Sequence, residues 1–140
     1  MFTAKVYTVM IGSLSGTMEE VFTAKEVVRK YNQDNAESSG KLFLPVEWSV
    51  KPEYFKKVDV VIGIVGNWLD KPDFIEDCVK AGKKVLLFFD AFRDPKNTIQ
   101  SEQDEVNVFR NRIQPNCYSS MFNGCSDLEQ HLGEWLLETK

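Results

Sequence analysis

The sequence predicts an α/β fold: one three-layer sandwich whose five parallel strands take the order 2-1-3-4-5. Runs rich in Val, Ile, Leu and Phe alternate with segments of helical periodicity along the 140 residues. Two of these runs, Val58–Val65 and Lys84–Phe89, are almost continuously apolar, as is typical of strands buried on both faces. A third run, Leu42–Trp48, contains Pro45, which lacks a backbone N–H and therefore favours the edge of a sheet.

Composition limits the function to a few classes. A chain of 140 residues with 43% hydrophobic content is long enough for one domain, which we expect to span residues 1–140. The net charge of −4 argues against a protein that binds nucleic acid by neutralising phosphates. No apolar run approaches the length of a membrane span, and the N-terminus lacks the apolar core of a signal peptide. We therefore expect a cytoplasmic protein that binds neither nucleic acid nor membrane.

The cysteines and the single histidine do not predict a reactive or metal site. Cys78, Cys117 and Cys125 are odd in number and lack CxxC spacing, so we expect them to be reduced and structural. His131 falls among the apolar positions of the last helix, away from the predicted ligand site. The sequence therefore predicts no zinc site and no Ser/His/Asp catalytic arrangement.

The first strand, loop and helix form the segment on which the rest of the fold is organised. An apolar run ends at Gly12, and the small-residue loop Gly12–Gly16 carries the hydroxyls of Ser13 and Ser15. Thr17 and Glu20 have the spacing of a capping box, so the helix is expected to begin there and to continue to Asn32. Free N–H groups at such a helix end can hold a phosphate or a carboxylate. The alternative is an ordinary tight turn, because GSLSG has neither the dinucleotide nor the Walker glycine spacing.

The remaining elements follow in order. A loop is expected over Asp34–Gly40. Further helices are expected over Pro52–Lys57, over Asp73–Ala81 with Gly82 as its stop, and over Ser101–Gln114 before Pro115. Asp73 is expected to be the N-cap of its helix. A weaker strand is predicted over Cys117–Phe122, and a last helix opened by a second capping box of Ser126 and Glu129.

In this fold ligands bind beyond the carboxyl ends of the strands, where strands one and three diverge. The candidate ligand-binding residues that follow these strand ends are Ser13, Ser15, Trp48, Asn67, Trp68, Asp90 and Arg93. Hydroxyls, flat aromatic rings, a guanidinium and a carboxylate suit a nucleotide or a flavin better than a lipid or a metal ion. Each also has a structural alternative: the tryptophans can be core residues, and Arg93 can pair with Asp90 or Asp94.

Six segments together form a recurring pattern: VMIGSLSGTMEEVFTAKEVVRKYN, LFLPVEW, VDVVIGIVGNWLDKP, GKKVLLFFDAFRDP, EVNVFRNRI and DLEQHLGEWL. This pattern resembles the TIR-like and nucleoside 2-deoxyribosyltransferase-like superfamily, especially a bacterial branch of unknown function. The resemblance implies a flavodoxin-like sheet and a pocket for a nucleoside, NAD or a related nucleotide. In active members it also implies cleavage of an N-glycosidic bond, with a helix glutamate acting at the anomeric carbon.

That glutamate is where the sequence departs from the pattern. The expected position holds Phe74, which can neither attack nor stabilise a cation. Glu76 lies half a turn further on and is the candidate catalytic carboxylate; the alternative is a solvated glutamate on an exposed face. The resemblance also implies assembly into a homo-oligomer, for which Phe74 and Ile75 would offer an apolar contact.

Three functions therefore remain open. The chain is an N-glycosidase or transferase acting on a nucleoside or NAD, a catalytically silent nucleotide-binding module, or a flavodoxin-like electron carrier with FMN as cofactor. The run SLSGTMEE and the acidic composition favour the carrier, whereas the short connection from Gly66 to Lys83 argues against it. The missing glutamate favours the silent module.

Overall fold

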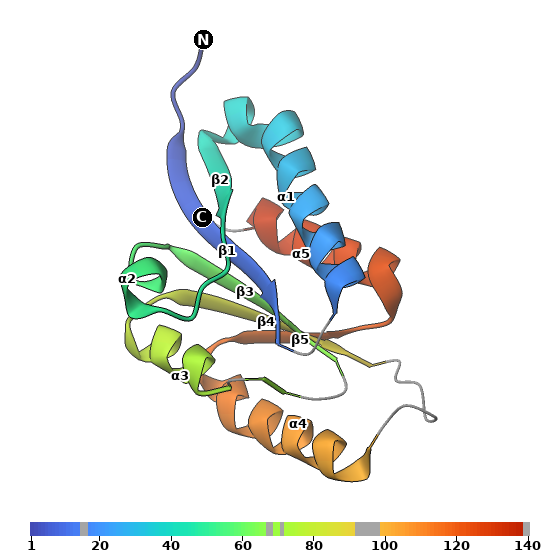
Figure 1. The fold of residues 1–140 in the computed structure, drawn as a ribbon. Helices are drawn as coiled ribbons and strands as arrows, with labels where there is room; N and C mark the ends of the chain where they lie inside the picture. The colour runs from blue at the N-terminus through green and yellow to red at the C-terminus, as the bar shows by residue number, and fades with distance from the viewer. Residues whose placement is uncertain (15–16, 67–68, 71, 92–98, 139–140) are drawn as a thin grey trace.

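The computed structural model describes residues 1–14, 17–66, 69–70, 72–91 and 99–138 (Figure 1). Its five strands form one parallel sheet in the order β2-β1-β3-β4-β5. The strands are β1 (Lys5–Ser13), β2 (Lys41–Val46), β3 (Val60–Val65), β4 (Lys84–Asp90) and β5 (Tyr118–Phe122). The predicted fold class and strand order are confirmed.

Helices cover both faces of the sheet. They are α1 (Met18–Ser39), α2 (Pro52–Phe55), α3 (Pro72–Lys80), α4 (Gln100–Ile113) and α5 (Gly124–Glu138), with a 3₁₀ turn at Gln114–Asn116. Helices α1 and α5 lie side by side on one face, and α3 and α4 cover the other (Figure 1). None of the helices in the described part of the chain has both the length and the apolar character that crossing a membrane requires.

The alternation of side chains along the strands divides the core into two clusters. In β1, Val9 and Ile11 pack beneath α1 and α5, whereas Met10 packs with α3 and α4. Every residue of β3 is buried, as expected for the central strand of a parallel sheet. The periodicity that predicted the strands is therefore also what fills both layers of the core.

Helix α1 is longer than the sequence indicated. Residues 34–39, expected to be a loop, continue the helix to Ser39. Ala36 is buried in this extension, and Gly40 ends it with a φ of 71° while its N–H donates to the Ala36 carbonyl at 2.9 Å. The prediction of a loop was wrong because the polar residues there lie on the outer face of a helix whose inner face is still packed.

The helix starts also differ from the predicted capping boxes. Thr17 is the N-cap of α1, but its side chain makes no capping hydrogen bond. Helix α5 begins at Gly124, so Ser126 lies inside it, and the Asn123 N–H donates instead to Asp127 Oδ2 at 2.8 Å. Asp73 likewise falls inside the first turn of α3, which begins at Pro72. In α5 a different side chain, that of Asp127, therefore accepts a hydrogen bond at the start of the helix.

The remaining boundaries shift by one or two residues. Strand β3 begins at Val60 rather than Val58, because the Asp59 carboxylate accepts the N–H of Thr8 at 2.9 Å beside the sheet. Strand β5 begins at Tyr118 rather than Cys117. Pro115 lies in the 3₁₀ turn that follows α4, two residues beyond the end of the helix at Ile113.

Strand β2 is an edge strand, as Pro45 predicted, and its outer side is covered by a side chain of α1. The Asn32 carboxamide donates through Nδ2 to the Phe43 carbonyl at 2.7 Å and accepts the Phe43 N–H through Oδ1 at 2.9 Å. Asn32 thus supplies the donor and the acceptor that a neighbouring strand would supply.

Candidate functional site

The candidate site is the rim of the sheet where β1 and β3 end. These strands are neighbours, and Ser13, the last residue of β1, is paired with Ile64 of β3. Beyond this pair the chain leaves β1 toward α1 on one face and leaves β3 toward α3 on the other. In this architecture ligands bind at the point where neighbouring connections leave the sheet toward opposite faces.

A pair of hydroxyls links the three elements that meet at this rim. Ser13 Oγ accepts the N–H of Thr17 at 2.7 Å and lies 2.9 Å from Thr17 Oγ1. Thr17 Oγ1 in turn lies 3.3 Å from the Ile64 carbonyl oxygen. The Thr17 hydroxyl has one proton, which it can donate to Ser13 Oγ or to the Ile64 carbonyl oxygen. The hydroxyls therefore fix the start of α1 against β1 and β3.

The start of the loop after β1 is also fixed by backbone hydrogen bonds of Leu14. Leu14 is buried, its N–H donates to the Ile64 carbonyl at 2.9 Å, and its own carbonyl accepts the Asp70 N–H at 2.7 Å. Leu14 is thus hydrogen-bonded both to β3, at Ile64, and to the connection that follows β3, at Asp70. A rigid backbone at this point is what a preorganised ligand loop needs.

Trp48 lies at the rim, on the α3 face of the sheet. A Cβ atom built on Gly12 would lie 2.2 Å from Trp48 Cδ2, so the indole rests directly on the glycine backbone. The ring also meets Phe74 edge-on, with centroids 5.2 Å apart, and packs against the second core cluster. Trp48 therefore packs against the core and also lies beside the carboxyl end of β1.

Phe74, at the position where the family resemblance implies a glutamate, is part of this apolar cluster. It is buried and contacts both Trp48 and Phe55, the latter with ring centroids 5.3 Å apart. Ile75 is fully buried as well. The expectation that Phe74 and Ile75 form an intermolecular contact was wrong, because both side chains are used inside the subunit.

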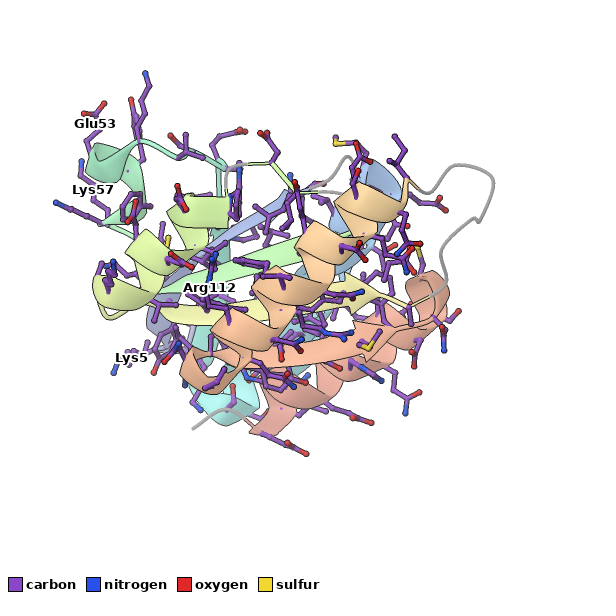
Figure 2. The ribbon with its side chains drawn as sticks, turned by 90° about the horizontal axis from the view of Figure 1, so that it is seen from below. Lys5, Glu53, Lys57 and Arg112 are labelled. Atoms are coloured by element: carbon purple, nitrogen blue, oxygen red, sulfur yellow. The ribbon has the colours of Figure 1, made fainter. Side chains whose placement is uncertain are left out.

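Glu76 pairs with Arg112 across α3 and α4. Its Oε1 lies 2.7 Å from Arg112 Nε, and Figure 2 shows Arg112 on α4 beside α3. Arg112 belongs to the last turn of α4, which leads toward the amino end of β5. The pair therefore lies toward the amino ends of the strands, whereas the rim is at their carboxyl ends. The described geometry does not bring Glu76 together with Ser13.

The structure places only part of the predicted rim. Asp90 is half-buried at the end of β4, where the next residue donates its N–H to Phe122. Ser15, Asn67, Trp68 and Arg93 lie outside the described residues. Thr17 was assigned only a capping role from the sequence, although a second hydroxyl four residues after Ser13, at the start of a helix, was a signal for the pair.

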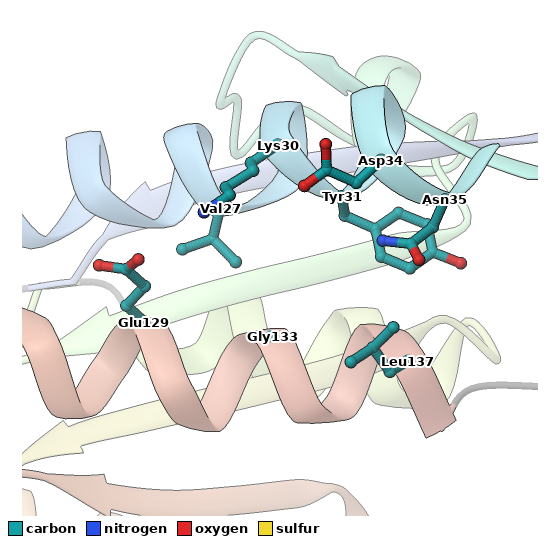
Figure 3. A pocket seen from close by; sticks show the side chains of 8 residues that line it. All are labelled: Val27, Lys30, Tyr31, Asp34, Asn35, Glu129, Gly133 and Leu137. Carbon is teal, nitrogen blue, oxygen red and sulfur yellow. The ribbon is translucent and has the colours of Figure 1, made fainter.

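A cavity of about 220 Å³ lies between α1 and α5, far from this rim (Figure 3). Its lining mixes apolar and charged side chains: Val27, Lys30, Tyr31, Asp34, Asn35, Glu129, Gly133 and Leu137. Pockets that hold small ligands usually measure about 300 to 1,000 Å³. The cavity is thus a small open groove, and no role in the candidate site follows from it.

Gly133 in this groove leads to a stability prediction. It lies inside α5 without a positive φ, and a Cβ there would meet nothing within 4 Å. Gly133→Ala should raise the free energy of unfolding by about 0.5–1 kcal/mol, because alanine loses less backbone entropy in a helix. Urea denaturation measures this change. Gly82→Ala is the matched control: it has equal space but a φ of 78°, and it should destabilise. A loss of stability in Gly133→Ala would contradict the prediction.

Two of the three thiols, those of Cys78 and Cys117, are poor nucleophiles near neutral pH. Burial raises the pKa of Cys78 to about 12 and that of Cys117 to about 11, so neither forms a thiolate near neutral pH. All three cysteines are free, which agrees with the expectation of reduced, structural residues. Among the described residues no group of three or more His, Cys, Asp or Glu side chains could hold a metal ion.

His131 has polar neighbours that sequence reasoning did not anticipate. Its ring lies between Ser120 of β5 and Asp127 of α5. The absence of a catalytic arrangement stays a prediction, because these contacts show proximity and not activity. The only signal in the sequence was Asp127, four residues before His131 and hence on the same side of the helix.

Comparisons with known proteins show the fold alone. No protein-family model matches the chain, and no curated protein matches it either. A short-chain flavodoxin associated with a non-canonical PDU bacterial microcompartment has a TM-score of 0.54 at 15% identity, covering 99% of both chains. A de novo designed Rossmann 2x3 protein has a TM-score of 0.52 at 13% identity, over 98% of this chain and 92% of the design.

An enzyme domain is similar to the same degree. Homoserine dehydrogenase from S. aureus has a TM-score of 0.52 at 10% identity, over 84% of this chain. This chain spans only 33% of the dehydrogenase chain. The three structures share a Rossmann- or flavodoxin-like α/β architecture with this protein. This similarity does not assign the chain to a superfamily within that architecture.

Proposed function

We propose that the chain is a nucleotide- or nucleoside-binding domain of the TIR-like and deoxyribosyltransferase-like type, without N-glycosidase activity. The observation that carries the proposal is the hydroxyl pair of Ser13 and Thr17, fixed at the start of α1 where β1 and β3 end. Hydroxyls beside the positive end of a 22-residue helix offer donors to a phosphate. The ligand would replace the hydrogen bonds that the pair makes internally.

The remaining predicted rim residues complete the proposed site. Trp48 would border the base, with Trp68 as a second aromatic surface, and Arg93 would neutralise the phosphate. Ser15 would add a hydroxyl to the loop, while Asn67 and Asp90 would bind polar edges of the base or ribose. The site would thus bind a ligand whose planar group and anionic group lie at a fixed separation.

The apolar cluster around Phe74 supports the absence of glycosidase activity. Cleavage of an N-glycosidic bond through an oxocarbenium-like transition state needs a carboxylate beside the anomeric carbon. The position implied by the resemblance is filled by a buried phenylalanine, and Glu76 is paired with Arg112 on the other side of α3. A domain of this kind would sense or hold a nucleotide.

A second candidate is an FMN-binding electron carrier. It is supported by the similarity to the short-chain flavodoxin along 99% of both chains and by the hydroxyl-containing loop after β1. The two candidates share the rim and differ in the ligand, so one binding experiment separates them.

The experiment is a thermal-shift and calorimetric screen against NAD, ADP-ribose, AMP, adenosine and FMN. A ligand that binds only the folded state at 100 times its dissociation constant adds about 2.7 kcal/mol of stability. We expect the phosphate-bearing nucleotides to bind more tightly than adenosine, and Ser13→Ala with Thr17→Val to weaken them about tenfold or more. Ser126→Ala, an exposed hydroxyl within α5, should bind like the wild type.

Each other outcome has a defined meaning. Release of nicotinamide from NAD by the wild type, lost in Glu76→Gln, would contradict a silent site and establish Glu76 as catalytic. Binding of FMN alone, with a yellow protein, would favour the electron carrier. Equal affinity of the double variant and the wild type for every ligand would place the site elsewhere.

A further inference from the structure

The contacts of His131 define its tautomer. Its Nε2 lies 3.2 Å from Asp127 Oδ1, and its Nδ1 lies 2.7 Å from Ser120 Oγ. An ionised carboxylate can only accept, so in the neutral ring the proton is on Nε2 and the lone pair of Nδ1 faces the serine. The Ser120 hydroxyl has one proton and two acceptors in reach, Nδ1 at 2.7 Å and the Met121 carbonyl at 3.4 Å. Donation along the shorter contact, to Nδ1, gives the arrangement of a nucleophile beside a general base.

The base is itself held in place. Asp127 Oδ2 accepts the N–H of Asn123 at 2.8 Å, which leaves Oδ1 directed at the imidazole. The side chains of His131 and Asp127 are 29% and 33% exposed, so solvent reaches the group while part of each side chain is packed. Nucleophile, base and orienting carboxylate therefore occur in one connected series, on the strand β5 and the helix that follows it.

The free edge of β5 supplies a backbone donor next to the serine. Strand β5 is the last of the sheet, and the N–H of Ala91 donates to Phe122 O at 2.8 Å. Since alternate residues of a parallel strand turn their backbone groups to opposite sides, Phe122 faces β4 and Met121 faces the free edge. The Met121 N–H, which follows the nucleophile directly, can therefore donate to an oxyanion formed at Ser120.

A cavity runs along the same edge. It measures about 300 Å³ and is lined by Phe89, Arg110, Gln114, Ser119, Ser120 and Met121. Arg110, whose Nη1 lies 3.1 Å from Met121 Sδ, brings a positive charge to it. Side chains alternate along β5, so Ser119 and Met121 face α4 with Phe89, whereas Ser120 Oγ faces His131 of α5. The cavity therefore lies on the other face of the strand from the hydroxyl, and it does not define the charge of a substrate.

We propose that Ser120, His131 and Asp127 form a second, hydrolytic site for small carboxylic esters. Ser120 Oγ bonds to the ester carbon as its proton passes to His131 Nδ1, and the carbonyl oxygen becomes an oxyanion beside the Met121 N–H. The C–O ester bond breaks, and the leaving alkoxide takes the proton from His131. Water, deprotonated by His131, then adds to the acyl group, and Ser120 leaves with that proton, which releases a carboxylic acid.

This site is independent of the proposed nucleotide rim, since β3 and β4 separate β5 from β1. The test treats the whole protein with diisopropyl fluorophosphate and locates the adduct by peptide mass spectrometry. Hydrolysis of 4-nitrophenyl acetate is followed alongside. We expect modification of Ser120, and hydrolysis of the acetate that is lost when Ser120 is modified.

Variants separate catalysis from a purely structural tether between β5 and α5. Ser120→Ala should abolish labelling, and Asp127→Asn and His131→Gln should each lower hydrolysis by about 10²-fold or more. Ser126→Ala, which removes an exposed hydroxyl of α5 outside this group, should remain within about twofold of the wild type. Circular dichroism identifies any variant that does not fold; if His131→Gln does not, labelling of Asp127→Asn decides. Absence of the adduct from Ser120, or equal labelling in folded Asp127→Asn, would overturn the proposal.

Discussion

Gly12→Ala should destabilise the protein by about 3 kcal/mol, since overpacking a closed core commonly costs 1–3 kcal/mol and here the obstacle is a rigid ring. The added methyl would lie 2.2 Å from Trp48 Cδ2 and 2.4 Å from Trp48 Cε3, distances that real Cβ atoms do not adopt. The indole would have to leave its contact with Phe74, and the end of β1 would move with it. Urea denaturation, followed by circular dichroism, measures the change in the free energy of unfolding.

A double-mutant cycle identifies the cause. In a Trp48→Ala background the methyl has space, so Gly12→Ala should then cost less than about 1 kcal/mol, giving a coupling energy of about 2 kcal/mol. Equal costs in both backgrounds would show that the glycine is needed for its backbone and not for the ring. Because Trp48 borders the rim, nucleotide affinity can be measured for the same variants, which shows whether the affinity depends on the position of the indole.

Asn32→Ala should lower the free energy of unfolding by about 2 kcal/mol. The substitution removes two hydrogen bonds and leaves the N–H and the carbonyl of Phe43 without the partners they have in the native protein. Asn35→Ala is the matched control, because Asn35 is on the same helix, about one turn later, and is also partly exposed. The control should change stability by less than about 0.5 kcal/mol.

The measurement is again urea denaturation, with light scattering at increasing protein concentration. The Asn32→Ala variant should also associate more readily, since an edge strand with free backbone groups can pair with another chain. Equal stability of the Asn32 and Asn35 variants would contradict a specific role for the carboxamide. An Asn32→Gln variant, with the same amide on a longer stem, should recover only part of the loss.

The strand order could be predicted from the sequence because it follows from local composition. A continuous apolar run such as Val60–Val65 can only be central, and a run with Pro45 can only be at an edge. The end of α1 could not be predicted in the same way. Its last turns contain Asn35, Ser38 and Ser39, whose side chains favour turns, and the packing of the opposite face overrides that preference.

The candidate site was predictable as a place and not as a set of contacts. The switch point follows from topology, which is why Ser13 was identified. The contact of Trp48 with Gly12, and that of His131 with Ser120, joins residues from different elements, and no local pattern encodes either. The hydroxyl of Thr17 shows that contacts also decide at short range. It bonds to Ser13 and lies near the Ile64 carbonyl, and the spacing of a capping box does not show that these groups compete with the helix N–H groups for it.

The two ends of the sheet differ in a way that limits how copies of this chain can join. The outer backbone of β2 is occupied at Phe43 by Asn32, and Pro45 has no N–H to offer, whereas β5 contains neither proline nor a charged residue. Sheet extension can therefore occur at one end only. Two molecules that joined through β5 would each present a blocked β2 at the outside, so the sheet would stop at ten strands, twice the five of one chain. Such growth closes with a two-fold axis and cannot continue into a filament.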